Sequence, residues 1–90
     1  MNPRVKSVSI LNDYKLSLVF TNGEKGIYDC SELIGFGVFK EFKNYGYFQL
    51  AKVEHDTVVW LHGQDIFPDT LYLDSVKISA MNKVKGKKLL

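Results

Sequence analysis

Apolar and polar residues alternate with a period of two through the first third of the chain, the pattern of strands that bury one face. Residues 14–20 place a tyrosine, two leucines and a phenylalanine on one face and mainly polar side chains on the other. Just upstream, Val8 and Ile10 alternate with serines, and a third short stretch runs through residues 26–30. Together these segments predict a three-stranded antiparallel meander.

Two polar steps predict the turns of this meander. Asn12 and Asp13 can close a tight hairpin between the first two strands. Between the second and third strands stands Asn22-Gly23, the pair of residue types that best tolerates the two positive φ angles of a type I′ turn. We therefore expect two hairpins in succession.

The period changes after residue 30. Ser31 is expected to cap a short turn, and Asp29 can accept backbone N–H groups there. Val38, Phe39 and Phe42 fall on one helical face, which predicts a two-turn helix that needs the sheet for stability.

A second hairpin is predicted from residues 47–54 and 57–62, with His55-Asp56 at its turn because both residue types tolerate positive φ. The loop that follows ends at Pro68. Beyond it, residues 70–73 can start a helix, whereas the alternation over residues 75–81 suits helix or strand equally. The predicted fold is α+β, an antiparallel sheet of about five strands with a short C-terminal helix or strand. It forms a single domain over residues 1–82, followed by a basic tail at 83–90.

Composition narrows the class of protein. A chain of 90 residues that is 46% hydrophobic and 24% charged is globular. Its one cysteine cannot form an internal disulfide, and its longest apolar run, residues 58–61, is far short of the ~20 residues of a membrane helix. We expect a cytoplasmic protein that does not contact membranes. Two histidines and one distant cysteine make no zinc set, so neither a metal nor a cofactor is expected.

The charge is unevenly distributed. Residues 1–76 carry seven basic and ten acidic side chains, a net charge of −3, whereas residues 77–90 carry five lysines and no acid. Such a tail can neutralise phosphates without reading sequence. A solvated tail that aids solubility is the preferred interpretation. The candidate nucleic-acid contacts are Lys83, Lys85, Lys87 and Lys88.

Few residues suggest chemistry. Asp65 and Asp69 are the nearest approach to an acid–base pair, although a turn and a helix cap explain them better. Trp60 could be a ligand platform, but a tryptophan in an apolar run is more often core. Tyr72 is similar and can return its hydroxyl to the loop, and His62 is expected to be solvated. These five residues form the candidate functional surface. No catalytic constellation is recognisable, so an enzyme is not expected.

The order of features resembles the bacterial family called Domain of Unknown Function 2442, over roughly residues 3–73. The matching landmarks include the pattern Leu-x-Leu-x-Phe-x-Asn-Gly-Glu at residues 16–24, then Tyr28-Asp29 and Gly37-Val38-Phe39. The most specific segment is residues 60–72, which begins with a tryptophan and ends with Leu-Tyr. His62 and Phe67 depart from the family pattern.

The resemblance implies a small α+β domain of the bacterial cytoplasm with no established enzymatic activity. Members are often encoded beside another short protein or fused to helix-turn-helix domains. The leading hypothesis is therefore a non-enzymatic interaction or regulatory module, antitoxin-like, with a co-encoded protein partner. A homodimer through a sheet edge is also expected to be within reach of this fold. The alternative is weak nucleic-acid binding through the lysine tail.

Overall fold

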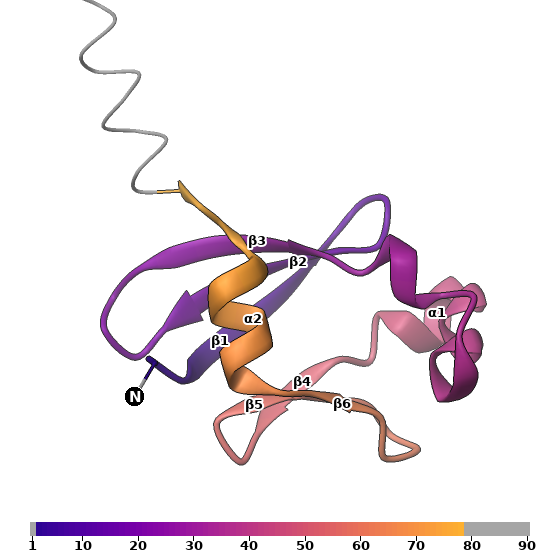
Figure 1. Cartoon of the computed structure of the whole chain (residues 1–90). Coiled ribbons are helices and arrows are strands. Elements are labelled where there is room, and N and C mark those ends of the chain that lie inside the picture. The colour runs from indigo at the N-terminus through magenta and orange to yellow at the C-terminus, as the bar shows by residue number, and fades with distance from the viewer. Residues whose placement is uncertain (1, 79–90) are drawn as a thin grey trace, which may run out of the picture.

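The predicted meander forms one face of the molecule (Figure 1). In the computed structural model, which describes residues 2–78, strands β1 (Val5–Leu11), β2 (Lys15–Phe20) and β3 (Lys25–Asp29) pair in antiparallel succession. Strand β7 (Val76–Lys77) joins β3 at the opposite side from β1. The resulting order is β1-β2-β3-β7.

The burial of β2 follows its alternating sequence. Leu16, Leu18 and Phe20 are fully buried, whereas the residues between them are only half-buried. Val8 and Ile10 of β1 lie opposite Leu18 and Leu16, on the same face of the sheet. The prediction of strands with one buried face is confirmed.

The meander turns differ in detail from prediction. Asp13 and Tyr14, not Asn12 and Asp13, adopt positive φ, at 62° and 61°. At the next turn Gly23 alone is left-handed, with φ 89°, and its N–H donates to the carbonyl of Phe20 at 2.9 Å. A type I′ turn needs two positive φ angles, so that assignment was wrong. The hairpin itself is confirmed, closed by a longer loop.

The helical segments gather at one end. They are η1 (Ser31–Leu33) and η2 (Gly37–Lys43), both 3-10 helices, and α1 (Tyr45–Phe48). Ser31 makes no side-chain cap. Instead Asp29 accepts the Ser31 N–H at 2.9 Å, as predicted for Asp29, and this bond holds the pKa of its carboxyl below the ordinary value.

Residues 38–43 are helical, but the predicted kind of helix is wrong, and one of the three side chains expected on its buried face is exposed. The segment is a 3-10 helix, which has three residues per turn, so side chains four apart do not stack as on an α-helix. Phe42 is fully buried, but Val38 is 67% exposed. Asn44 then caps α1, its side chain accepting the Tyr47 N–H at 3.3 Å.

The second hairpin belongs to a separate three-stranded sheet. Strands β4 (Lys52–Glu54), β5 (Thr57–Val59) and β6 (Asp65–Ile66) pair in that order. His55 and Asp56 both adopt positive φ, at 54° and 66°, which confirms the predicted turn. The pairing of β6 corrects the expectation that the approach to Pro68 is only loop.

The helix that residues 70–73 can start is present, and within the ambiguous stretch from residue 75 the strand interpretation holds for Val76–Lys77. Helix α2 (Pro68–Asp74) begins at the proline and is followed directly by β7. The rest of the ambiguous stretch, from residue 79, and the basic tail at 83–90 lie outside the described residues.

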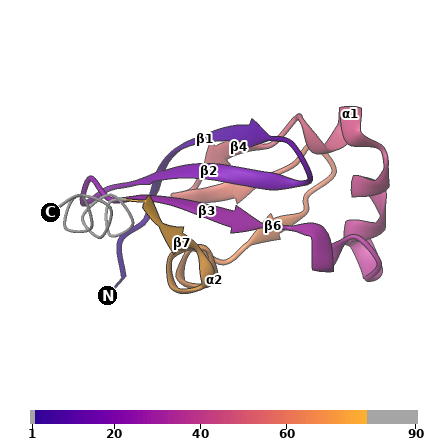
Figure 2. The ribbon, with the colours of Figure 1, turned by 90° about the horizontal axis from the view of Figure 1, so that it is seen from above.

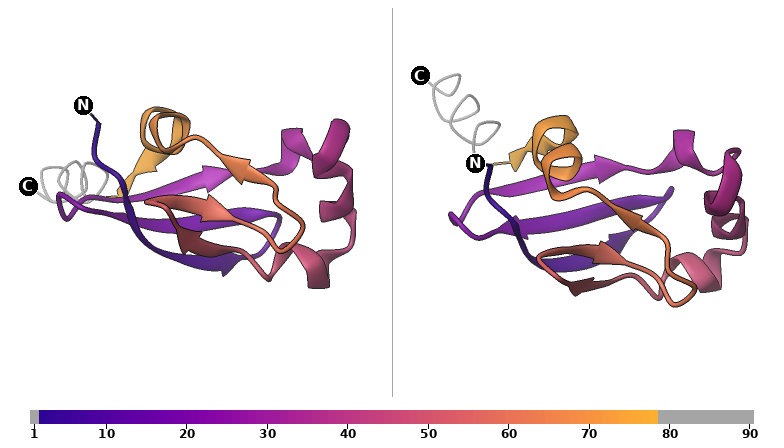
Figure 3. Two further views of the ribbon diagram at one scale, coloured as in Figure 1. Left: turned by 90° about the horizontal axis from the view of Figure 1, so that it is seen from below. Right: turned by 60° about the horizontal axis from the view of Figure 1, so that its bottom comes forward.

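The two sheets lie one over the other and enclose the core (Figures 2 and 3). The α+β class and its antiparallel strands are confirmed, with the strands divided between two sheets. Trp60, which follows β5, packs against Phe42 and Phe48 from the helical end, with ring centroids 4.4 and 5.8 Å away. Aromatic side chains therefore close the open end between the sheets.

Candidate functional site

Four polar side chains form one hydrogen-bonded network at the helical end, and we call it the end cluster: Glu41, Tyr47, His62 and Gln64. Tyr47 and Gln64 are buried, and the Tyr47 hydroxyl donates to Gln64 Oε1 at 2.5 Å. The same hydroxyl accepts the backbone N–H of His62 at 2.9 Å. Tyr47 thus fixes the loop between β5 and β6 against helix α1.

Glu41 ties the cluster to η2. Its Oε2 lies 2.7 Å from Nδ1 of His62, and its Oε1 accepts a bond of 2.9 Å from Nε2 of Gln64. These bonds, that to His62 foremost, hold the pKa of the Glu41 carboxyl below its ordinary value. Gln64 also donates to the carbonyl of Val38 at 3.1 Å. Both carboxylate oxygens are therefore occupied.

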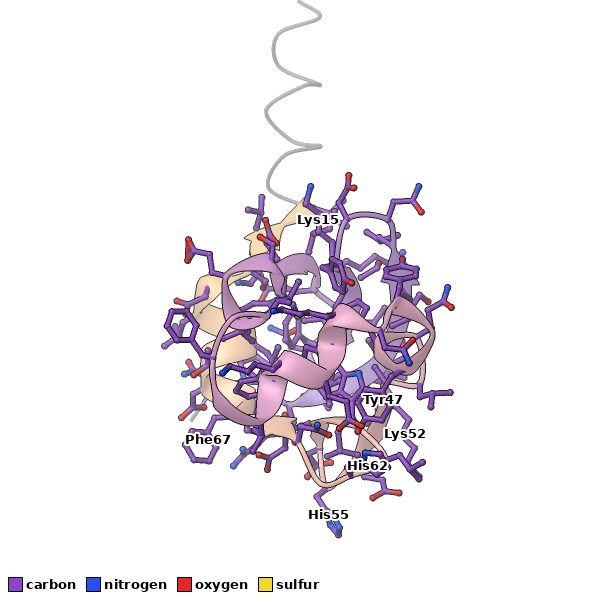
Figure 4. The ribbon with its side chains drawn as sticks, turned by 90° about the vertical axis from the view of Figure 1, so that its right-hand side faces the viewer. Lys15, Tyr47, Lys52, His55, His62 and Phe67 are labelled. Atoms are coloured by element: carbon purple, nitrogen blue, oxygen red, sulfur yellow. The ribbon has the colours of Figure 1, made fainter. Side chains whose placement is uncertain are left out.

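His62 is held in one orientation although it is exposed. Its ring stacks on that of Tyr47, with centroids 5.0 Å apart and an interplanar angle of 21°. Figure 4 shows the Tyr47 and His62 side chains beside one another. A histidine paired with a carboxylate can act as a base. No serine, threonine or cysteine nucleophile accompanies this pair in the hydrogen-bonded network of the end cluster.

Large apolar side chains stand exposed around the end cluster. Phe36 is 69% exposed, Val38 67% and Leu61 68%. Val38 and Leu61 belong to segments joined by the bond from Gln64 to the Val38 carbonyl. Figure 1 places the segments of all three at the helical end. We call these three side chains, with Lys40 and Lys43, the end face.

The two lysines give the end face a positive rim. Lys40 and Lys43 are exposed residues of η2, and neither forms an ion pair with another described residue. Glu41, the one acid of η2, directs both carboxylate oxygens to His62 and Gln64 rather than to either lysine. The end face therefore offers apolar contact and unpaired positive charge together.

The structure separates the five residues predicted as one functional surface. Trp60 is 2% exposed and its Nε1 donates to the carbonyl of Phe48 at 2.9 Å, so it is core. The Tyr72 hydroxyl donates to Glu24 in the hairpin between β2 and β3 rather than to its own loop. Only His62 reaches the end cluster.

Asp65 and Asp69, the predicted pair of aspartates, lie on different elements. Asp65 is an exposed residue of β6, and Asp69 lies in the first turn of α2. Helix α2 has no side-chain cap bond, so the predicted cap is wrong. The negative charge of Asp69 still interacts favourably with the positive N-terminal end of the α2 dipole.

Sequence reasoning missed Glu41, Tyr47 and Gln64 as members of a site. Their partners lie between 15 and 26 positions away, so no local spacing reveals them. Gln64 is buried, at 5% exposure, and a buried amide needs partners, but its loop position in the sequence gave no sign of that burial.

The part of the chain that the structure describes offers little room for a small ligand or metal. No cavity of ligand size occurs within residues 2–78. Among the same residues no three histidine, cysteine or carboxylate side chains converge as metal ligands. Cys30 is fully buried, and burial raises the pKa of its thiol to about 12.

The predicted nucleic-acid contacts Lys83, Lys85, Lys87 and Lys88 fall outside the described residues. Lys77, the first lysine of the basic stretch, is bound to the body of the protein. The Lys77 ammonium donates to the backbone carbonyl of Tyr72 and lies 4.2 Å from the centre of the Tyr72 aromatic ring. No helix in the described region is long and apolar enough to cross a membrane.

Comparison with known proteins gives one match. A family model described as "Protein of unknown function (DUF2442)" matches residues 5–77, which spans every described strand and helix. No curated protein and no solved structure matches the chain.

Proposed function

This chain belongs to the DUF2442 family, and from the surface it presents we propose that it acts as a non-enzymatic protein-interaction module of a regulatory, antitoxin-like kind. The observation that carries the proposal is the end face. Phe36, Val38 and Leu61 are each about two-thirds exposed, and clustered exposed apolar side chains mark interaction sites.

The end face is rigid, which favours binding by a preformed surface. The loop that presents Leu61 is fixed by the bond from the His62 N–H to Tyr47 and by the bonds of Gln64. Ordering a surface before binding reduces the entropy that the complex must lose. The end cluster therefore serves as the support of the end face.

The rim selects the partner by charge. Lys40 and Lys43 have no acidic partner within residues 2–78, so a segment that combines apolar and acidic side chains would complement the end face. Complementary charge speeds encounter and suppresses wrong partners. A co-encoded small protein, as the family setting implies, is the partner we propose.

Calorimetric titration of the purified chain with the product of its neighbouring gene tests the proposal. We expect a complex, and Leu61→Asp should weaken it by at least about tenfold, since one buried anchor contributes 2 kcal/mol or more. Leu73→Asp is the matched control, because Leu73 is 64% exposed but lies on α2, away from the end face. No binding, or equal weakening by both variants, would refute the assignment.

A second candidate function rests on the sequence charge. Residues 77–90 contain five lysines and no acid, a balance that supports weak binding to nucleic-acid phosphates. Because Lys77 is engaged with Tyr72, the lysines at positions 83, 85, 87 and 88 would supply this binding.

A further inference from the structure

The hairpin between β2 and β3 carries a chemically labile pair of residues at its tip, Asn22 and Gly23. Asparagine is a thermolabile residue in proteins, because the backbone nitrogen of the next residue can attack its side-chain amide. Glycine at the next position leaves this attack unobstructed, since it has no Cβ. Both residues are exposed, and an added Cβ at Gly23 would meet nothing within 4 Å. Packing therefore does not shield the pair.

Hydrogen bonds restrain the two groups that would react. The Gly23 N–H donates to the carbonyl of Phe20 at 2.9 Å, so the attacking nitrogen is engaged. The Asn22 side chain donates from Nδ2 to Oε1 of Glu24 at 2.5 Å, and its Oδ1 accepts the Glu24 N–H at 3.0 Å. The amide that would be attacked is therefore held on Glu24 through both of its polar atoms.

Helix α2 contacts both residues that hold this turn. The Tyr72 hydroxyl donates to the same Oε1 of Glu24 at 2.5 Å. The Tyr72 ring meets that of Phe20 edge-on, with centroids 5.0 Å apart and an interplanar angle of 90°. Tyr72 thus touches the residue that binds the Gly23 nitrogen and the residue that binds the Asn22 amide.

We propose that Asn22 is a site of spontaneous deamidation and that the docking of Tyr72 on Glu24 and Phe20 controls its rate. While both contacts persist, the Gly23 nitrogen and the Asn22 amide stay bound to other groups. Local opening of the α2 contact frees them, and the rate of a reaction that needs an open state follows the population of that state. The inference does not involve the end face, so it is independent of the proposed function.

Water is the only co-reactant that this modification needs. The Gly23 nitrogen forms a bond to Cγ of Asn22 and closes a cyclic imide. The bond from Cγ to Nδ2 breaks, and Nδ2 leaves as ammonia with the proton that the Gly23 nitrogen gives up. Water then adds to either imide carbonyl and reopens the ring. The product at position 22 is aspartate, or isoaspartate when the chain continues through the side-chain carbonyl carbon.

The product cannot restore the original contact. A carboxylate only accepts hydrogen bonds, so position 22 loses the donor that bonds to Glu24 in the unmodified protein. Two carboxylates at hydrogen-bonding distance also disfavour one another's charged form. Because the ammonia is lost to solvent, the change is one-way. Deamidation of Asn22 would therefore permanently weaken the attachment of α2 to the hairpin.

Peptide mass spectrometry of the chain held in mildly alkaline buffer tests the proposal. We expect conversion at residue 22 to be at least about tenfold faster in Tyr72→Phe than in the unmodified protein, since the lost hydrogen bond joins a charged group and opposes local opening. The unmodified protein in urea should react faster still. Tyr45→Phe is the matched control and should leave the rate unchanged, because the Tyr45 hydroxyl donates to the Leu11 carbonyl instead.

Three further measurements separate local opening from unfolding. Labelling of the fully buried Cys30 thiol reports unfolding of the core and should stay slow while residue 22 reacts. Glu24→Ala removes the shared acceptor of Tyr72 and Asn22 and should accelerate conversion even if the Tyr72→Phe chain folds poorly. Asn22→Asp should lower the thermal midpoint, whereas Asn12→Asp, at another exposed turn residue, should not.

Several results would overturn the inference. Conversion of residue 22 in urea no faster than that of Asn12 would remove the site. Equal rates in the folded and urea-unfolded protein, or no acceleration in Tyr72→Phe and Glu24→Ala, would remove the control by α2. Acceleration matched by equally fast labelling of Cys30 would assign the control to unfolding of the whole chain rather than to Tyr72.

Discussion

The hydroxyl of Tyr72 donates a hydrogen bond of 2.5 Å to Oε1 of Glu24, joining helix α2 to a hairpin turn 48 positions earlier in the chain. Asn22 donates to the same carboxylate oxygen. These bonds, that from Tyr72 foremost, hold the pKa of the Glu24 carboxyl below its ordinary value of 4.5 and raise that of the Tyr72 hydroxyl. Two landmarks of the family pattern, Asn-Gly-Glu and Leu-Tyr, are thus a single contact in space.

Replacing Tyr72 should therefore change how stability depends on acid. A carboxyl whose pKa is lowered by folding stabilises the native state above its ordinary pKa, and this contribution disappears as pH falls through the lowered value. Tyr72→Phe should lower the thermal midpoint at pH 7 and flatten its fall below pH 4.5. Tyr45→Phe is the control, because the Tyr45 hydroxyl donates to a neutral carbonyl, that of Leu11. Identical pH profiles for the Tyr72→Phe and unmodified proteins would contradict the role of this bond.

Tyr47→Phe should destabilise the fold without changing its shape. The change leaves Oε1 of buried Gln64 and the N–H of His62 without their partner. Unsatisfied buried polar groups cost about 1–3 kcal/mol, which urea unfolding would measure. Glu41→Gln, at an exposed member of the same end cluster, should cost less. A larger loss from Glu41→Gln would mean that the buried bonds are not the main support of the cluster.

Gly26→Ala should be destabilising because β7 and Ser75 lie close to β3. A Cβ at position 26 would lie 2.7 Å from Oγ and 3.1 Å from Cβ of Ser75. Overpacking of this kind costs about 1–3 kcal/mol. At Gly35 an added Cβ meets nothing within 4 Å, so Gly35→Ala serves as the control in the same denaturant titration. Equal effects would show that the close approach of Ser75 relaxes freely.

Cys30 should be unreactive in the native protein. Its side chain is fully buried and burial raises the pKa of its thiol to about 12, so little thiolate forms at pH 8. A thiol reagent should label one equivalent after unfolding and almost none before. Rapid labelling of the folded protein would show that the region around Cys30 opens readily.

Removal of residues 83–90 tests the lysine tail. This deletion takes away four lysines, each worth about 0.9 in the slope of log binding constant against log salt on duplex DNA. If the tail carries nucleic-acid binding, the slope should decrease by up to roughly 3.6. A matched chain with these lysines changed to glutamine separates charge from length. Unchanged binding by both chains would exclude the tail.

Some features of this protein follow from local physics and were predictable. Alternation fixed the buried face of β2, with Leu16, Leu18 and Phe20 inward. Residue types that tolerate positive φ marked the turn at His55 and Asp56. Trp60 was correctly expected in the core, because large apolar side chains within an apolar run are usually buried.

Alternation along residues 5–30 indicated the three strands of the meander and their buried faces, and the sequence landmarks indicated the family. Strand β6 was not predicted, and residues 47 and 48, expected in a strand, lie in α1. Only the tertiary structure decided which distant polar groups meet, because such bonds depend on how the two sheets lie over one another. Glu41 reaches His62 across 21 positions and Tyr72 reaches Glu24 across 48. Local propensity contains no information on such pairs, whereas burial of Tyr47 and Gln64 forces each polar atom to find a partner. The end cluster is a consequence of that assembly.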